Sequence, residues 1–567
     1  MPTVKHIISS LLLLLGLAVV IVACKKSPDD PAPVVKPTPT TTITSIDPAT
    51  APVGSTIAIN GTNFNTTPGS NTIVIGGVVA TVVSATDTRL VVVVPAGATS
   101  GPISVTANGQ TAQASTTFTV ATPALKPVKE VSGTTFANLS WKKDTIYLLR
   151  GLVYIPADYT LTIEAGTVIR GAGPERDPTG TNHAGALIVE RRGKVIAQGT
   201  ASQPIVFTSA KAVGQRNYGD WGGVVLIGKA PINQLGTTPV PNGVRGTVET
   251  YGEPLDNSGT LQYVRIEYAG ATQPTTPVTR LSGLSLLGVG SGTTIDHVQI
   301  SYSGGDGFSW FGGSVNLKNL FAYRSFDDDW SVDWGYVGNV QFGVALRDPD
   351  VADQSGSNGF EVENYSPTET TDVTAVTLVN GLTQAAPVFA NMSNFAFNTT
   401  PTTTNTAKGT GAYQSGIYLR RNSAISIYNS VVYGYPVGVT LNGSGTGLTS
   451  GTIDLKGVVL ANVLTPIAGT GSISTDQASA YFTAAERSNQ IVQASNLASL
   501  LINGANFTLT APNFLPQALS PLLGSGTSGG KLINSFFTQV AYRGAFGSDN
   551  WISGWTNVDP QNKDYDR

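Results

Sequence analysis

Acidic and aromatic side chains that suit ligand binding gather in the second half of a chain in which only 12% of the residues are charged. The candidates for a ligand site are Asp333, Glu361, Glu363, Tyr418 and Arg420. Carboxylates on a rigid backbone supply the oxygen ligands that Ca²⁺ prefers; the candidates for such a metal site are Asp328, Asp329, Asp333, Glu361 and Glu363. Like charges about 5 Å apart repel, so this patch favours a bound cation or the nearby Arg420. We therefore expect a Ca²⁺-assisted saccharide site, with a solvated acidic face held by weak ion pairs as the alternative.

These side chains meet only if the chain stacks repeated coils. An apolar pattern h-x-x-h-x-h recurs at Leu261-Val264-Ile266, Ile295-Val298-Ile300, Leu317-Leu320-Ala322, Val373-Val376-Leu378 and Leu455-Val458-Leu460, with a weaker copy at Ile427-Ser430-Val432. A second short strand follows most copies, as at Gly307-Phe308-Ser309-Trp310 and Asp329-Trp330-Ser331-Val332. The shortest step between second strands is about 22 residues, too few for a propeller blade and enough for one solenoid coil. The pattern predicts a parallel β-helix, which is right-handed because parallel crossovers nearly always are.

The expected register assigns each side chain to a face. Residues expected to point inward are Phe308, Trp330, Phe360, Ile417 and Val439, together with Trp310, Val332, Val362, Leu419 and Leu441. The residues between them point outward and stack from coil to coil. We therefore expect Glu361 beside Tyr418, and Asp333 in one column with Glu363 and Arg420.

The N-terminus predicts export and a lipid anchor. Lys5 and His6 precede an apolar run over 7–23, which has the length of a signal peptide. The run ends at Ile21-Val22-Ala23-Cys24, which resembles the bacterial lipobox and implies acylation of Cys24, the one cysteine of the chain. Residues 1–23 are thus a lipoprotein signal peptide, and the Pro- and Thr-rich residues 24–42 form a linker. We expect the outer membrane as location, facing the cell surface or the periplasm; the alternative is a membrane-spanning anchor with a chance cysteine.

The remaining domain boundaries follow from composition. Residues 43–120 alternate short Val, Ile and Thr runs with turn residues, which is typical of an antiparallel sandwich. Ile46-Asp47-Pro48, followed by Gly54 and Phe64, is similar to the immunoglobulin-like IPT/TIG family, which implies a spacer domain. Residues 121–140 are expected to be a linker, and 141–567 a β-helix domain with a C-terminal cap. One helix is expected from Asp476 to Gln490, closing the last coils.

Four motifs of the large domain resemble a family of Bacteroidota surface lipoproteins. They are Tyr218-Gly-Asp-Trp-Gly-Gly223, Gly305-Asp-Gly-Phe308 with Phe311-Gly-Gly313, Asp327-Asp-Asp-Trp330, and Gly544-Ala-Phe-Gly547 with the following Asp549-Asn550-Trp551. The resemblance spans roughly residues 140 to 560. The resemblance implies a β-helix fold and a location at the cell surface, but the family has no settled activity that could be carried over.

Composition and motifs also argue against several classes of function. A net charge of −3, with no basic run beyond Lys25-Lys26, argues against a nucleic-acid partner. No Gly-x-Ser-x-Gly nucleophile elbow with triad partners stands out in the sequence, and neither does a phosphate loop. We expect a lipid-anchored protein that binds an extracellular glycan or another surface ligand without catalysis. Two alternatives stay open: a Ca²⁺-dependent polysaccharide lyase with Arg420 near its acidic residues, and a structural or adhesive stalk.

Overall fold

The computed structural model describes ten stretches of the chain: residues 39–122, 124–233, 244–246, 252–274, 279–364, 384–401, 411–421, 423–443, 448 and 452–567. The signal peptide, Cys24, most of the expected 24–42 linker and the apolar copy at 373–378 lie outside them. The chain divides into two compact units, Met1–Ala124 and Leu125–Arg567. Within the described stretches, no helix combines the length and the apolar character needed to cross a bilayer.

The first unit is an antiparallel sandwich. Its strands are β1 (Thr42–Asp47), β2 (Thr50–Pro52), β3 (Thr56–Thr62), β4 (Asn71–Ile75), β5 (Val78–Ala85), β6 (Arg89–Val93), β7 (Gly101–Ala107) and β8 (Gln110–Ala121), with a 3₁₀ turn η1 at Pro68–Ser70. Alternate residues of β4 and β7, including Ile73 and Val105, are buried in one core because successive strand side chains point to opposite faces. The predicted immunoglobulin-like domain is confirmed.

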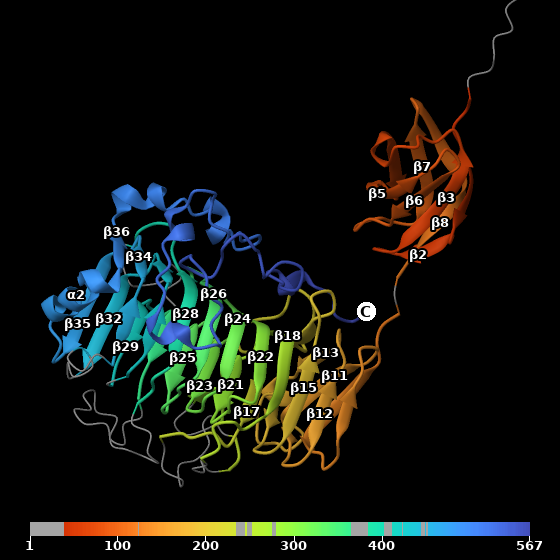
Figure 1. The fold of residues 1–567 in the computed structure, drawn as a ribbon. Helices are drawn as coiled ribbons and strands as arrows, with labels where there is room; N and C mark the ends of the chain where they lie inside the picture. Colours follow the sequence, from red (N-terminus) through yellow and green to blue (C-terminus); the bar gives the residue numbers. More distant parts are fainter. Residues whose placement is uncertain are drawn as a thin grey trace, which may run out of the picture. The chain divides into compact units, whose positions relative to one another are not determined.

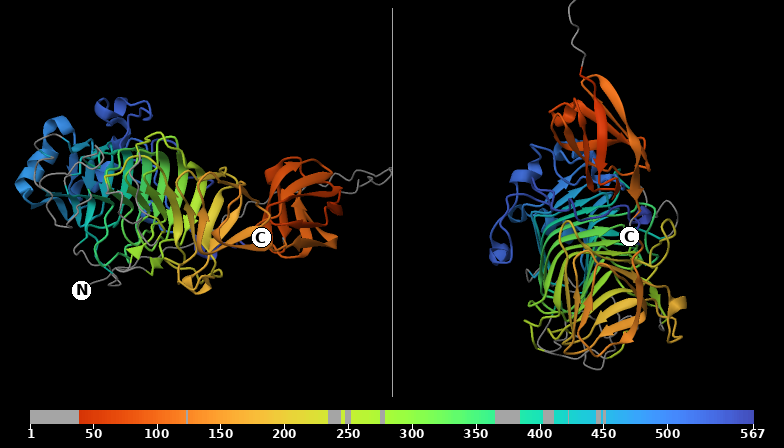
Figure 2. Two further views of the ribbon diagram at one scale, coloured as in Figure 1. Left: turned by 90° about the horizontal axis from the view of Figure 1, so that it is seen from below. Right: turned by 90° about the vertical axis from the view of Figure 1, so that its right-hand side faces the viewer.

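The second unit is a parallel β-helix (Figures 1 and 2). Its first column of strands starts at β11 (Ile146–Ile155) and continues through β14 (Ala186–Val189), β17 (Gly223–Ile227), β21 (Leu284–Leu287), β23 (Phe308–Phe311), β25 (Trp330–Asp333), β27 (Phe360–Val362), β29 (Ser415–Leu419), β32 (Val437–Gly443) and β35 (Thr465–Gly471). Phe308, Trp330 and Phe360 stack in register and belong to the central core. The predicted fold and its inward positions are confirmed.

In several coils, one long strand that bends sharply at a single corner residue forms the other two faces. The long strands are β18 (Gly259–Glu267), β22 (Thr294–Ser301), β24 (Asn316–Tyr323), β26 (Asn339–Leu346) and β28 (Val388–Phe395), and the same path is split elsewhere into β12/β13 (Thr160–Ile163, Val168–Gly171), β15/β16 (Lys194–Gln198, Ile205–Ser209), β30/β31 (Ser426–Tyr428, Val431–Tyr433) and β33/β34 (Asp454–Lys456, Val459–Ala461). The corner residue is left-handed in successive coils, with φ of 53° at His297 and 56° at Asn319. The left-handed residue turns the chain, so both apolar residues of h-x-x-h face inward.

The apolar pattern missed the coil that contains β28. β28 lies between β26 and β30, in register with both. Its third inward position is Asn394, whose side-chain oxygen accepts a hydrogen bond of 3.0 Å from the Trp330 indole. Because this position is polar, the sequence pattern did not show it.

The stack begins earlier than expected. β9 (Val128–Thr134) pairs with β11, and β10 (Leu139–Trp141) pairs with β12. The expected linker over 121–140 is therefore wrong over most of its length. Lys129 and Glu130 of β9 are both exposed, because this strand lies on the outermost coil. The sequence therefore lacks the alternation of apolar and polar residues that predicts a strand.

A short helix closes the far end of the stack. α2 (Thr475–Thr483) has a capping box between Ser474 and Gln477 and places Ala478 and Phe482 in the central core. The expected helix to Gln490 is too long, because the chain leaves helical geometry at Ala484 and continues as a 3₁₀ turn, η3 (Ala485–Arg487), and β36 (Gln490–Val492). Small elements outside the stack are η2 (Pro174–Arg176), β19 (Thr272–Gln273) and β20 (Thr279–Arg280).

The last residues, 494–567, form a segment that we call the C-terminal strap. It contains only 3₁₀ turns: η4 (Ala494–Leu500), η5 (Gly504–Phe507), η6 (Pro521–Gly524), η7 (Gly530–Ile533) and η8 (Pro560–Asn562). Its Phe514 and Phe546 cover the outward apolar side chains Phe321 and Val344. The strap then runs back to the first coils, where Tyr565 packs with Ile146, Val168 and Val206 (Figure 1). The cap expected from the sequence is thus a strap along the stack.

Candidate functional site

The outward row expected on the first column is present. Ser331, Glu361 and Tyr418 are register neighbours on β25, β27 and β29. The Arg420 guanidinium lies 2.9 Å from Glu363 and 3.3 Å from Glu361, and Arg421 lies 2.5 Å from Glu363. The structure therefore brings Glu361, Glu363 and Arg420 together, with the two carboxylates already paired to arginines.

Asp333 lies at the edge of this row. Burial and the Glu363 carboxylate raise the pKa of Asp333 to about 7, against hydrogen bonding by the Trp334 backbone. Burial and Glu361 likewise raise the pKa of Glu363 to about 7 although two arginines lower it. Both carboxyl groups are therefore harder to ionise than ordinary acidic side chains.

Tyr418 stands beside the row as an aromatic neighbour. Its hydroxyl accepts a hydrogen bond of 3.2 Å from the Asn442 side chain. The Arg420 guanidinium lies 5.6 Å from the centre of its ring. The five expected ligand-site residues thus share one surface.

Asp329 does not belong to that surface, and its assignment as a metal ligand is wrong. Its side chain is fully buried and lies 3.1 Å from the equally buried Arg347. Arg347 also donates hydrogen bonds to the backbone oxygens of Asn358, Ser325 and Asp327. The pair therefore fixes the turns that precede β25 and β27.

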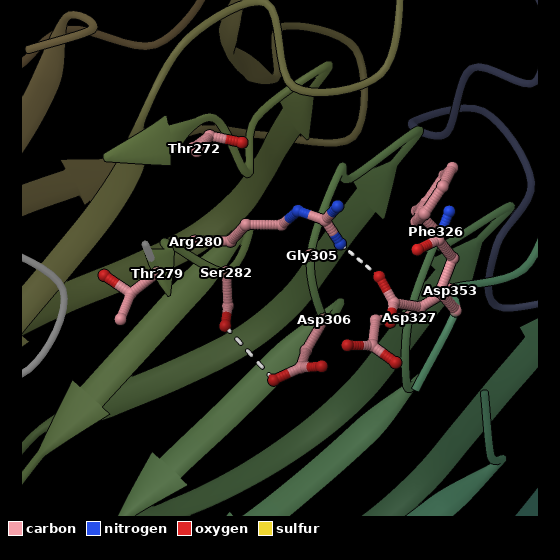
Figure 3. Close-up of a pocket in the computed structure, with 10 residues that line it drawn as sticks. Thr272, Thr279, Arg280, Ser282, Gly305, Asp306, Phe326, Asp327 and Asp353 are labelled. Carbon is pink, nitrogen blue, oxygen red and sulfur yellow. Dashed lines mark hydrogen bonds and ion pairs between the residues drawn. The ribbon is translucent and has the colours of Figure 1, made fainter. Parts of the chain in front are cut away.

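An open pocket of about 580 Å³ lies at the start of β23 and β25. Its lining combines one cation, one aromatic ring, hydroxyl groups and carboxylates: Thr272, Thr279, Arg280, Ser282, Gly305, Asp306, Phe326, Asp327, Asp353 and Gln354. Figure 3 shows the Arg280 guanidinium reaching across to Asp353, while Asp306 and Asp327 lie side by side below it. The Arg280 guanidinium also lies 5.2 Å from the centre of the Phe326 ring.

Three carboxylates meet beneath the pocket. Oxygen atoms of Asp306, Asp327 and Asp328 all lie within 4.8 Å of one another. Burial raises the pKa of all three, and Glu361 raises that of Asp328 further. Of the expected metal ligands, Asp328 belongs to this trio and Glu361 adjoins it. Among the described residues, the trio is the group whose geometry suits a cation.

A repeated turn contact explains the positions of two members of the trio. Asp306, Asp328 and Asn358 each stand two residues before a first-column strand. The Asp306 side chain accepts a hydrogen bond from the Asp328 backbone at 3.3 Å, and Asp328 accepts one from Asn358 at 2.6 Å. The equal offset of Asp306 and Asp328 from Phe308 and Trp330 was the sequence signal that could have revealed Asp306.

The Tyr218-to-Gly223 motif has a structural role. Its Asp220 is buried and accepts hydrogen bonds from Ser209 at 2.7 Å and Lys211 at 2.6 Å. Its Trp221 lies in the core and donates a hydrogen bond of 2.7 Å to the Glu267 backbone. The motif therefore fastens a turn, whereas Asp306 and Asp327 of the two later motifs line the pocket.

Comparison with known protein families assigns each of the two units to a domain family. Residues 41–120 match the IPT/TIG domain, and residues 133–499 match the pectate-lyase like beta helix domain. No curated protein matches the chain.

Solved structures give short or distant likenesses. An auxiliary nutrient binding protein from Bacteroides thetaiotaomicron is 25% identical over 16% of this chain and 24% of its own, with a TM-score of 0.14. A putative phosphatase from the same organism is 30% identical over 14% of this chain and 18% of its own, also with a TM-score of 0.14. The catalytic domain of a GH87 alpha-1,3-glucanase, solved with tetrasaccharides, is 11% identical over 78% of this chain and 91% of its own, with a TM-score of 0.24.

The chain thus spans about a quarter or less of the first two of these proteins. The family match, in contrast, covers most of the β-helix unit and agrees with its coils. The chain belongs to the pectate-lyase like beta helix family and carries an IPT/TIG domain before the β-helix.

Proposed function

We propose that this protein is a lipid-anchored outer-membrane protein that binds an extracellular glycan and does not turn it over. The observation that supports this function is the open pocket of about 580 Å³ on the first column of the β-helix. Its size lies within the range of small-ligand sites, which is roughly 300–1,000 Å³. Hydroxyl groups, carboxylates and the Phe326 ring are the groups that hydrogen-bond and stack on sugars.

The row of Glu361, Tyr418 and Arg420 lengthens this surface along the stack. Neighbouring coils repeat at about 4.8 Å, so an extended chain can meet side chains of several coils in turn. Glu361 connects the outward row to the carboxylates beneath the pocket, because it pairs with Arg420 and faces Asp328. A surface of this kind suits a polymer better than a single small molecule.

The second candidate function is a Ca²⁺-dependent polysaccharide lyase. The close approach of Asp306, Asp327 and Asp328 favours it, because carboxylate oxygens are the ligands of Ca²⁺. The state of Arg420 disfavours it: burial lowers the pKa of Arg420, but Glu363 and Glu361 more than offset this and leave it above its ordinary value. An arginine that holds its proton so firmly is a poor general base.

A glycan array tests the binding function. We expect the wild-type protein to bind at least one glycan class and Arg280→Ala to lose that signal, because the guanidinium spans the pocket beside Phe326. The control is Arg192→Ala, an exposed arginine paired with Asp158, which should bind as the wild type does. Equal binding by Arg280→Ala contradicts the pocket as the site. Ultraviolet-absorbing unsaturated products that form with Ca²⁺, and stop with a chelator, contradict a purely binding role.

Membrane fractionation tests the anchor. The lipobox ending at Cys24 supports acylation of that cysteine, and each buried CH₂ of an acyl chain contributes about 0.8 kcal/mol to membrane binding. We expect Cys24→Ala to move the protein out of the outer-membrane fraction. Retention of the variant in that fraction contradicts lipid anchoring through this residue.

A further inference from the structure

We propose that the open pocket selects glycans that carry a protonated primary amine, namely oligosaccharides of non-acetylated amino sugars. This inference rests on the proposed function, glycan binding at the pocket, and deepens it by naming the ligand class. Three observations carry it: the charge of the lining, one carboxylate without a partner, and the hydrogen bonds already made by its neighbours.

The first observation is the charge of the lining. Asp306, Asp327 and Asp353 are acidic, and Arg280 is the one cationic side chain among the described residues that line the pocket. Asp353 already pairs with the Arg280 guanidinium. Two carboxylates therefore face the pocket without a matching cation, and a ligand that brings more carboxylates would be repelled.

The second observation is the state of Asp327. Within the described part of the chain, the half-buried Asp327 carboxylate makes neither a hydrogen bond nor an ion pair. In Figure 3 its side chain lies beside that of Asp306, under the Arg280 side chain. Burial and the carboxylates of Asp306, Asp353 and Glu361 raise the pKa of Asp327, and Arg347 lowers it. An unpaired carboxylate beside other carboxylates gains most from a ligand that supplies positive charge and N–H donors.

The third observation separates an ammonium group from a bare divalent cation. One Asp306 oxygen accepts a hydrogen bond of 2.8 Å from Ser309, and the other faces the Asp328 backbone N–H. An Asp328 oxygen accepts from the Asn358 backbone. Ca²⁺ requires six to eight oxygen ligands, and donors aimed at these oxygens compete with it. An ammonium group needs only about three acceptors, which Asp327 and the nearby hydroxyl groups can supply.

The size of the pocket adds to the argument. A volume of about 580 Å³ exceeds what a single ion occupies and admits a sugar ring. The Phe326 ring and the Thr272 hydroxyl group lie in the lining and can contact the ring and its hydroxyl groups. An amine on the sugar would then reach the carboxylates at the base of the pocket.

Isothermal titration calorimetry of the full-length protein in detergent, with EDTA and at pH 6, tests the inference. The probes are the glucosamine tetramer, its fully N-acetylated counterpart, a galacturonate tetramer and spermidine. We expect the glucosamine tetramer to bind about tenfold more tightly than the acetylated one, because a hydrogen bond between charged groups is stronger than one between neutral groups. Asp327→Asn should abolish this preference, so that the variant binds the two glucosamine tetramers with equal affinity. The control Asp158→Asn removes an exposed carboxylate and should keep the preference.

The outcomes separate this inference from the proposed function. Equal binding of the two glucosamine tetramers, or an unchanged preference in Asp327→Asn, overturns amine selection and leaves glycan binding intact. Tighter binding of the galacturonate tetramer, with EDTA or with added Ca²⁺, also overturns it. Binding of spermidine without any tetramer overturns the glycan as the source of the amine. If neither the tetramers nor any glycan on the array binds, the proposed function itself fails.

Discussion

At the scale of single residues, the site is built from carboxylates in different electrostatic states. Asp329 is neutralised by Arg347 inside the protein, Glu363 is held between two arginines, and Asp327 has no partner among the described residues. Removing one member of a buried pair such as Asp329–Arg347 leaves a buried charge uncompensated. Acidic residues that look alike in the sequence thus serve the fold in one case and face the ligand pocket in another.

Asp333 gives a prediction about pH. Its pKa in the folded protein is about 7, whereas its ordinary value is 3.8. Between these two pH values the unfolded chain has released the proton and the folded chain keeps it, so the free energy of unfolding falls as the pH rises. We expect Asp333→Asn to remove this contribution, so that the variant gains stability over the wild type from pH 3.8 to about 7.

Urea denaturation across this pH range measures the difference. The control is Asp158→Asn, whose carboxylate is exposed and paired only with Arg192. A constant difference between Asp333→Asn and the wild type at every pH would show that Asp333 has no raised pKa.

At the scale of elements, the defining feature is the corner in each long strand. The ladder between β22 and β24 skips His297 and Asn319, the two corner residues, and then resumes. The left-handed conformation costs an ordinary side chain about 1–2 kcal/mol, and asparagine tolerates it better than most. The corners let one strand supply two faces of the core.

Asn319 tests the corner. Its φ is 56°, and Asn319→Val puts a β-branched side chain into this conformation. We expect that variant to lower the free energy of unfolding by about 1–2 kcal/mol. Asn319→Gly is the matched control and should cost less, because glycine adopts positive φ without a steric penalty. Chemical denaturation measures the free energy of unfolding of both variants. Equal losses of stability in the two variants would contradict backbone conformation as the cause.

At the scale of the β-helix unit, the C-terminal strap joins the two ends of the stack. Coils of a solenoid contact only their neighbours, but the strap leaves the last coils near β36 and ends on the first coils. There the Tyr565 hydroxyl donates a hydrogen bond of 2.7 Å to the buried Glu267, and Asp566 pairs with Arg170 at 2.8 Å. Opening of the first coils therefore requires release of the strap.

Tyr565 tests this connection. We expect Tyr565→Ala to lower the free energy of unfolding by about 3–5 kcal/mol, as for other large aromatic side chains removed from a core. Hydrogen exchange should rise first in β11, β13 and β16, whose Ile146, Val168 and Val206 pack against the ring. The neighbouring variant Arg567→Ala removes only a half-exposed ion pair and should change little. Faster exchange confined to the strap itself would contradict a clamping role.

The sequence alone determined the coils, their register and the outward row, because strand side chains alternate with period two and apolar residues repeat once per coil. This periodicity predicts Phe308 next to Trp330 and Glu361 next to Tyr418, as the register of the strands confirms. Only the tertiary structure decided that Asp329 faces inward, that Arg280 and Asp306 share a pocket, and that Tyr565 returns to the first coil. Turns and the strap have no period, so their side chains are directed by contacts between residues far apart in the chain.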